Sequence, residues 1–188
     1  MPRVKLFDRD EILEKAMQLF WEKGYASTSL NDLTMHLGIG KGSFYATFKS
    51  KQDLFHAAFD LYRNTRIEKL EQLLNSESKV EVGLRKFLEL NLEEFLQDSL
   101  RKGCFVSNAC SEMSSDSGAL RDKLIDHHRI LEQTLIDYMM RNQINPEKAE
   151  SVASTVTTFL IGMSQQSKFN RERKRYLRSI NHILKLLD

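Results

Sequence analysis

Apolar residues recur three or four positions apart along almost the whole chain, with few residues that would interrupt a helix. Only two prolines and eight glycines occur among the 188 residues. This spacing places apolar side chains on one face of a helix, turn after turn. Glycines and polar stretches divide the pattern into segments. The sequence therefore predicts an all-α protein of about nine helices.

The expected helix ends follow from capping signals. Asp8 suits the N-cap of the first helix, Gly24 and Gly38 suit the ends of the first two, and Pro146 suits a first helical position. Either Thr28 or Ser29 can cap the second helix. The expected helices are 8–24, 28–37, 40–48, 51–74, 80–100, 104–112, 117–141, 146–169 and 172–187.

The composition excludes several classes of protein. The start, MPRVKLFDRD, has no apolar signal-peptide core, and no run approaches the roughly 18 apolar residues of a membrane span. Two cysteines in a chain of this size make no disulfide framework. We therefore expect a cytoplasmic protein without a membrane partner.

The stretch LTMHLGIGKGSFYATFKSK, residues 33–51, joins two short helices through a turn that contains Gly38 and Gly40. Two short helices in this arrangement, between longer ones, are typical of a helix-turn-helix. The second helix of that motif enters the DNA major groove. Gly40 and Gly42 leave its start uncrowded, so that its free N–H groups can approach phosphate. The chain's positive excess also lies within residues 1–51, because the charges of the remainder balance.

The segment TSLNDLTMHLGIGKGSFYATFKSKQDLF resembles the DNA-binding signature of the TetR (tetracycline-repressor) family of transcriptional regulators. The order Gly-Lys-Gly-Ser-Phe-Tyr-x-x-Phe-x-x-Lys carries the resemblance, which covers about residues 8–60. It implies a homodimer that binds double-stranded DNA and a small-molecule effector. Each chain would have a three-helix DNA-binding head, residues 1–50, and a ligand-binding and dimerisation domain, residues 51–188. Gly40 departs from the pattern, because many members have a Ser N-cap there.

The resemblance also assigns DNA contacts to individual positions. Lys41 and Lys51 offer ammonium groups to phosphate, and three hydroxyl groups lie along the recognition helix. Phe44 and Phe48 are expected in the core of the head instead. The predicted DNA-binding residues are Thr28, Lys41, Gly42, Ser43, Tyr45, Thr47 and Lys51.

The stretch RKGCFVSNACSE resembles the cysteine segment of electrophile- and oxidant-sensing family members such as the N-ethylmaleimide-responsive repressor. Arg101, Lys102 and a helix N-terminus would lower the pKa of Cys104 and favour its thiolate. The alternative is that Cys104 and Cys110 are small buried apolar residues. A bridge between them is disfavoured, because six residues of one helix separate the Cα atoms by roughly 9 Å, beyond the bridging limit of roughly 7 Å.

Two further sets of residues are assigned in the C-terminal part. An apolar effector pocket is expected between residues 80 and 170, with plain core packing as the alternative. Its candidate lining is Phe87, Asn91, Phe95, His127, Leu131 and Phe159. The last two helices of each chain are expected to form a dimeric four-helix bundle, unless they bury against their own chain. The predicted interface residues are Ser154, Thr158, Gly162, Ile180, Ile183 and Leu184.

The sequence as a whole favours a dimeric transcriptional regulator, most simply a repressor that a small-molecule or reactive effector releases from a palindromic operator. One alternative is an all-α ligand-binding protein or enzyme with an incidental helix-turn-helix, and another is an architectural DNA-binding protein without an effector. An enzyme would need a catalytic or metal constellation. The adjacent His127 and His128 point about 100° apart on a helix and cannot share one ligand. We therefore predict no enzymatic activity, metal or cofactor.

Overall fold

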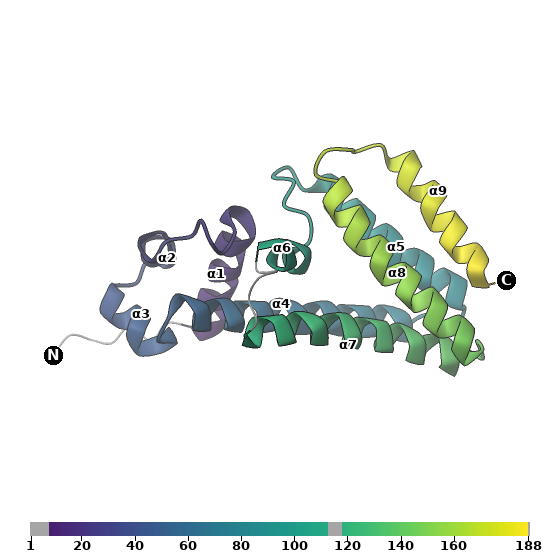
Figure 1. The fold of residues 1–188 in the computed structure, drawn as a ribbon, viewed down its shortest axis with the longest axis horizontal. Helices are drawn as coiled ribbons and strands as arrows, with labels where there is room; N and C mark the ends of the chain where they lie inside the picture. The colour runs from purple at the N-terminus through teal and green to yellow at the C-terminus, as the bar shows by residue number, and fades with distance from the viewer. Residues whose placement is uncertain (1–7, 113–117, 188) are drawn as a thin grey trace. The chain divides into compact units, whose positions relative to one another are not determined.

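The computed structural model describes residues 8–112 and 118–187. Within these residues the chain forms nine α-helices, a terminal 3₁₀ helix and no strand (Figure 1). The all-α prediction is confirmed. The expected start of the seventh helix, residue 117, lies outside the described residues. The helices are α1 Arg9–Lys23, α2 Leu30–Leu37, α3 Lys41–Phe48, α4 Lys51–Asn75, α5 Val80–Gln97, α6 Phe105–Glu112, α7 Ala119–Arg141, α8 Pro146–Gln166 and α9 Arg173–Leu184, followed by η1 Lys185–Leu187.

Side chains and proline set several of the helix ends. The Asp8 carboxylate accepts a hydrogen bond from the backbone N–H of Asp10 (3.0 Å) and so caps α1. Pro146 begins α8 behind the N-cap Asn145. Helix α5 ends at Gln97, three residues before the expected end, because the Asp98 carboxylate binds the backbone N–H groups of the residues that would continue the helix.

The chain divides into two compact units, Met1–Asn64 and Thr65–Asp188, so the division falls within α4. The first turns of α4 belong to the N-terminal unit because Leu54, Phe55 and Phe59 are buried in it. The Phe55 ring packs edge-to-face against Phe20 of α1, with centroids 5.0 Å apart. The sequence placed the domain boundary at residue 50, and the functional extent of the head stays a prediction.

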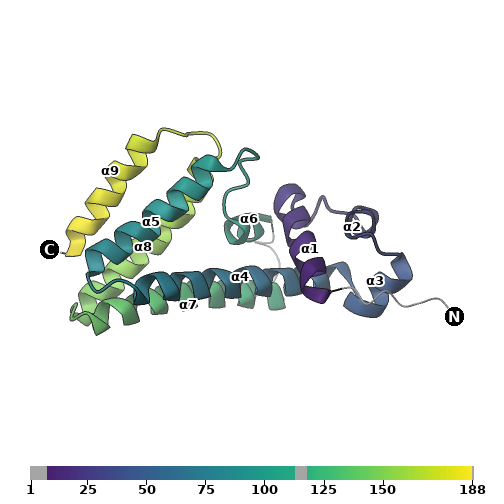
Figure 2. The same ribbon diagram turned by 180° about the vertical axis from the view of Figure 1, so that it is seen from behind.

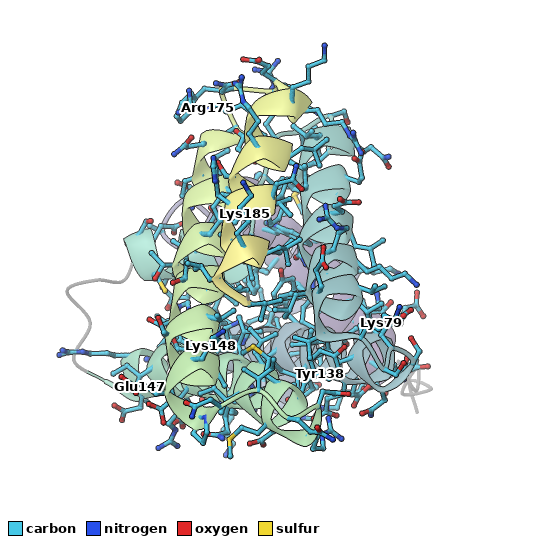
Figure 3. The ribbon with its side chains drawn as sticks, turned by 90° about the vertical axis from the view of Figure 1, so that its right-hand side faces the viewer. Lys79, Tyr138, Glu147, Lys148, Arg175 and Lys185 are labelled. Atoms are coloured by element: carbon cyan, nitrogen blue, oxygen red, sulfur yellow. The ribbon has the colours of Figure 1, made fainter. Side chains whose placement is uncertain are left out.

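The C-terminal unit has its own core, built from the second part of α4 and from α5, α7, α8 and α9. Helices α5, α8 and α9 lie side by side (Figures 1 and 2). Tyr138 of α7 is buried, and its hydroxyl donates to the carbonyls of Glu77 (3.1 Å) and Lys79 (3.2 Å). Figure 3 labels Tyr138 and Lys79 at this end of the unit. Gly83 packs against the same hydroxyl, where a Cβ atom would not fit.

Candidate functional site

The turn between α2 and α3 has the geometry of a helix-turn-helix. Gly38 adopts φ 67° and ψ 28°, a left-handed conformation that favours glycine. The backbone N–H of Ile39 donates to the carbonyl of Thr34 (3.1 Å), and the Ile39 side chain is buried. The left-handed Gly38 and this hydrogen bond are those of a Schellman C-cap. Only three residues therefore separate α2 from α3, and the position of α2 determines that of α3.

Helix α3 has one buried and one exposed side. Phe44 and Phe48 are buried in the N-terminal unit, whereas Tyr45 is 52% exposed. A Cβ atom at Gly40 or Gly42 would meet no other atom of the chain within 4 Å, so the start of the helix is open. The structure therefore brings five of the predicted DNA-binding residues together on the exposed side of α3: Lys41, Gly42, Ser43, Tyr45 and Thr47.

The DNA contact of Thr28 stays a prediction, and the structure shows where its side chain lies. Its side chain is fully buried, and its hydroxyl donates to the carbonyl of Gly24 (2.5 Å). The N-cap of α2 is the next residue, Ser29, whose hydroxyl accepts from the backbone N–H of Asp32 (3.1 Å). Sequence capping rules allowed either residue, and the tertiary contacts turn Thr28 inward.

Lys51 contacts the loop between α1 and α2. It is the first residue of α4, and its ammonium donates to the carbonyls of Tyr25 and Thr28, both at 2.7 Å. The same ammonium lies 4.2 Å from the centroid of the Tyr25 ring. The Lys51 side chain thus joins α4 to the loop between α1 and α2.

Sequence reasoning missed Asp32, which completes the cap of α2. Its carboxylate accepts from the backbone N–H of Ser29 (2.9 Å) and pairs with the Lys23 ammonium of α1 (2.9 Å). The hydrogen bond from Lys23, followed by those from Ser29, holds the pKa of Asp32 well below its usual value. The pattern Ser29-x-x-Asp32 is a capping box that could have identified this residue.

One cysteine directly precedes α6 and the other lies within it. Cys104 is half-buried and precedes the helix, and its carbonyl accepts from the backbone N–H of Asn108 (3.0 Å). Cys110 is half-buried, with Sγ 3.9 Å from Nε2 of His128. Burial, followed by the charge of Cys104, raises the pKa of Cys110, and burial lowers the pKa of His128. Neither cysteine is in a disulfide, and the chemistry at Cys110 favours its protonated thiol.

The sequence assigned Arg101 and Lys102 as the cations beside Cys104, but it missed Lys168 from the segment after α8. The Lys168 ammonium donates to Oδ1 of Asn108 (2.6 Å), and it interacts electrostatically with Cys104. Burial lowers the pKa of Lys168, against the opposing effects of Cys104 and Glu112. Because Lys168 is so distant in sequence, no local pattern indicates the contact.

The six predicted pocket residues lie within or around the core of the C-terminal unit, and none of them lines the surface groove described below. Phe87 and Phe95 lie in the core of the C-terminal unit, and Leu131 and Phe159 pack against that core. Asn91 donates to the carbonyl of Phe87 (2.8 Å), and His127 is buried. A surface groove of about 650 Å³ lies elsewhere, lined by Glu71, Leu74, Asn75, Thr134, Asp137, Met140 and Arg141. The effector pocket stays a prediction.

The predicted dimer residues fall into two groups. Ser154 and Thr158 of α8 are exposed, and a Cβ atom at Gly162 would meet open space. In contrast, Ile180, Ile183 and Leu184 of α9 are buried in the core of their own chain. Figure 3 shows α8 and α9 next to each other. The apolar side of α9 faces α5 and α8 of the same chain, and the place of its three residues in a dimer interface stays a prediction.

Residues 8–112 and 118–187 contain no group of three or more His, Cys, Asp or Glu side chains placed to hold a metal ion. No helix in the same described ranges is long and apolar enough to cross a bilayer.

Comparisons with known proteins match both parts of the chain. Residues 12–58 match the family model "Bacterial regulatory proteins, tetR family", and residues 82–182 match "Transcriptional regulator LmrA/YxaF-like, C-terminal domain". The chain belongs to the tetR family of bacterial regulatory proteins. The predicted resemblance is thereby confirmed, and an incidental helix-turn-helix in an unrelated protein is not favoured.

Several known proteins are similar to this chain over most of their length. The transcriptional repressor ComR of Escherichia coli K12 is 38% identical over 146 residues, which cover 77% of this chain and 70% of ComR. The repressor BdcR of the same organism is 27% identical and covers 88% of this chain, which spans 82% of BdcR. A cysteine mutant of the regulator CifR, solved with 26-bp double-strand operator DNA, has a TM-score of 0.83 and 28% identity, with coverage of 97% and 98%. Reduced E. coli NemR shares the fold, with a TM-score of 0.82, 20% identity, and coverage of 95% and 96%.

Proposed function

We propose that this tetR-family regulator is a dimeric repressor that binds a palindromic operator through α3 and leaves it when an effector binds. The observation that carries the proposal is the exposed polar side of α3, which Phe44 and Phe48 anchor from behind. Two relatives, ComR and BdcR, are transcriptional repressors, and CifR has been solved with operator DNA. The protein is further proposed to act in the cytoplasm, without catalytic activity.

Each part of α3 has a distinct proposed role on DNA. The exposed ammonium of Lys41 binds a backbone phosphate, and the open N-terminus at Gly42 lets backbone N–H groups do the same. Tyr45 and Ser43 offer hydroxyl groups to phosphates or base edges. The Thr47 hydroxyl already donates to the carbonyl of Ser43 (2.9 Å), which leaves its oxygen to accept a hydrogen bond from DNA.

The proposed dimer uses the exposed side of α8. Ser154, Thr158 and Gly162 recur every four residues there, and their small size lets a second helix approach closely. Ile161 is 40% exposed beside them and supplies apolar area. In the dimer, two copies of α3 lie about one DNA turn apart, roughly 34–36 Å, and so bind two half-sites.

For the effector, we propose a reactive electrophile or oxidant that acts at Cys104. Cys104 directly precedes α6, and the Lys168 ammonium interacts with it electrostatically. The Cys104 thiolate adds to the carbon–carbon double bond of a maleimide, and the adjacent carbon takes up a proton, so the adduct needs no leaving group. A reversible apolar ligand in the predicted core pocket is the second candidate.

Mass spectrometry after treatment with N-ethylmaleimide, with operator binding measured in parallel, separates these two effectors. We expect one adduct at Cys104 and release from DNA, with both lost in Cys104→Ser and retained in the matched control Cys110→Ser. An unmodified Cys104, or unchanged DNA binding after its modification, would exclude the electrophile as effector.

The regulator itself is tested by selection of bound sequences from a random duplex library. We expect a palindromic consensus with half-sites about 10 base pairs apart, bound by one dimer in a salt-sensitive manner. Binding without any sequence preference would contradict the repressor and favour an architectural role.

A further inference from the structure

The exposed side of α8 carries its negative charge at one end. Glu147 and Glu150 are exposed in the first turns of the helix, and the exposed residues that follow on the same side are small or apolar. These are Ser154, Thr158 and Ile161. Neither carboxylate has an ion-pair partner among the described residues. The exposed side of α8 therefore begins with acids whose charge is not neutralised by the described part of the chain.

Helix α9 carries the opposite charge at its own start. Arg175 and Arg178 are exposed, and neither has an ion-pair partner within residues 8–112 and 118–187. Their neighbour Arg173 differs, because its guanidinium pairs with Glu93 of α5 (2.6 Å). The face formed by α8 and α9 thus presents carboxylates on one helix and guanidinium groups on the other.

These acids and arginines lie far apart within one chain. Helices α8 and α9 run antiparallel, since the Lys148 ammonium near the start of α8 donates to the carbonyl of Leu187 after the end of α9 (3.1 Å). The start of α8 therefore lies beside the end of α9. Figure 3 shows Glu147 and Arg175 at opposite ends of this face. Contact between the acids and these arginines therefore needs a second molecule.

A second copy of the chain supplies the complementary charges in one orientation. A two-fold axis across the helices reverses the partner, so the start of its α9 comes to lie beside the start of α8. An axis along the helices would instead bring Glu147 to the partner subunit's Glu147, and like charges placed opposite each other disfavour an interface. The charge pattern therefore favours the first orientation.

We propose that the two copies of α8 pack antiparallel in the dimer, where Glu147 and Glu150 contact the partner subunit's Arg175 and Arg178. The inference rests on the dimer of the proposed function and adds its orientation. Each contact occurs twice, because the interface is isologous. The same charges favour a second copy over a related chain without them, since such a chain would leave these groups opposite no counter-charge.

Charge reversal and its compensation test the orientation. The dissociation constant of the full-length, DNA-free dimer is measured by fluorescence-detected sedimentation at about 50 mM KCl, where salt screens weakly. Glu147→Lys with Glu150→Lys should raise this constant about 30-fold or more, because attraction becomes repulsion in both copies of the contact. Further substitution of Arg175→Glu and Arg178→Glu exchanges the two signs and should restore the constant to within about threefold of wild type.

The matched control is Glu68→Lys with Glu71→Lys, which reverses exposed acids of the same spacing on α4 and should leave dimerisation unchanged. An unchanged dissociation constant in the α8 variant would overturn the proposal. So would a folded combined variant that dimerises no better than the α8 variant. Should the lysine variant fail to fold, Glu147→Gln with Glu150→Gln takes its place, with an expected weakening of about threefold to tenfold.

Cross-linking reads the orientation without relying on charge. In a Cys104→Ser, Cys110→Ser background, Glu150→Cys with Arg178→Cys should give a covalent dimer with a short bis-maleimide. Glu150→Cys alone should not, because the two copies of this position lie at opposite ends of the interface. A covalent dimer from Glu150→Cys alone would show the parallel orientation and overturn the proposal. Failure of the proposed function would appear differently, as wild-type protein that stays monomeric or selects no operator.

Discussion

The recognition helix and the loop that supports it use the same residue types in opposite ways. On α3, Lys41, Ser43 and Tyr45 point away from the chain and are exposed. In the supporting contacts, Lys51 and Thr28 turn inward, and their polar groups bind backbone carbonyls. The proposed DNA contacts are therefore those hydroxyl and ammonium groups that stay exposed on α3, beside the buried Phe44 and Phe48.

The largest effect on stability is expected at Phe44, which is buried, in contrast to its exposed neighbour Tyr45 on α3. Phe44 is fully buried and Tyr45 is exposed. Phe44→Ala should lower the free energy of unfolding by about 3–5 kcal/mol, because it leaves a cavity in the head. Tyr45→Ala should leave thermal unfolding nearly unchanged and still weaken operator binding. Equal losses of stability in the two variants, measured by urea denaturation, would contradict the assignment of the two sides of α3.

A smaller effect is expected in the supporting loop. Thr28→Val keeps the shape of the side chain but removes the hydroxyl that donates to the Gly24 carbonyl. We expect the free energy of unfolding to fall by about 1 kcal/mol. The slope of log Kd for DNA against log salt concentration should stay at its wild-type value. The matched exposed variant is Ser43→Ala, which should weaken binding without a change in stability. If Thr28→Val lowered the slope of log Kd for DNA against log salt concentration, Thr28 would contact DNA after all.

The Asp32 cap makes the stability of the head depend on pH. The pKa of Asp32 is lowered in the folded state, so the native protein binds its proton less tightly than the unfolded chain does. The stabilisation is fully present above the unfolded pKa of about 4, and it is lost as the pH falls through the lower folded pKa. Asp32→Asn should therefore be less stable than wild type at pH 7, and the difference should shrink below pH 4. Thermal melts of both proteins from pH 2 to 7 measure this difference in stability. A difference that grows as the pH falls would contradict the stabilising role of the Asp32 carboxylate.

The smallest effect is expected at Gly40, the N-cap of α3, which has no side-chain hydrogen bond. Its extended backbone, with φ −74° and ψ 156°, accommodates a serine without strain, and the added Cβ would meet open space. Gly40→Ser should raise stability by a few tenths of a kcal/mol. Weaker operator binding in this stabilised variant would indicate that DNA approaches α3 closely at Gly40, and unchanged or improved binding would argue against that close approach.

Local sequence patterns predicted the recognition helix but not the contacts between α4 and the α1–α2 loop. The glycine turn and the apolar spacing of Phe44 and Phe48 are sequence-local, so they fixed both the motif and its exposed side. Lys51 meets Tyr25 and Thr28 across 26 and 23 residues, a contact that depends on how α1, α2 and α4 pack. The apolar spacing in α9 likewise predicted an apolar side. It could not predict that α5 and α8 of the same chain cover that side.

The most direct test of the account uses a variant that changes only the exposed side of α3, Lys41→Gln with Ser43→Ala and Tyr45→Phe. These substitutions leave Phe44 and Phe48 in the core, so the unfolding temperature and the oligomeric state should match wild type. We expect affinity for the selected operator to fall about 100-fold or more, since each lost contact costs about 1–3 kcal/mol. A folded triple variant that binds the operator with wild-type affinity would contradict the claim that this side of α3 contacts DNA.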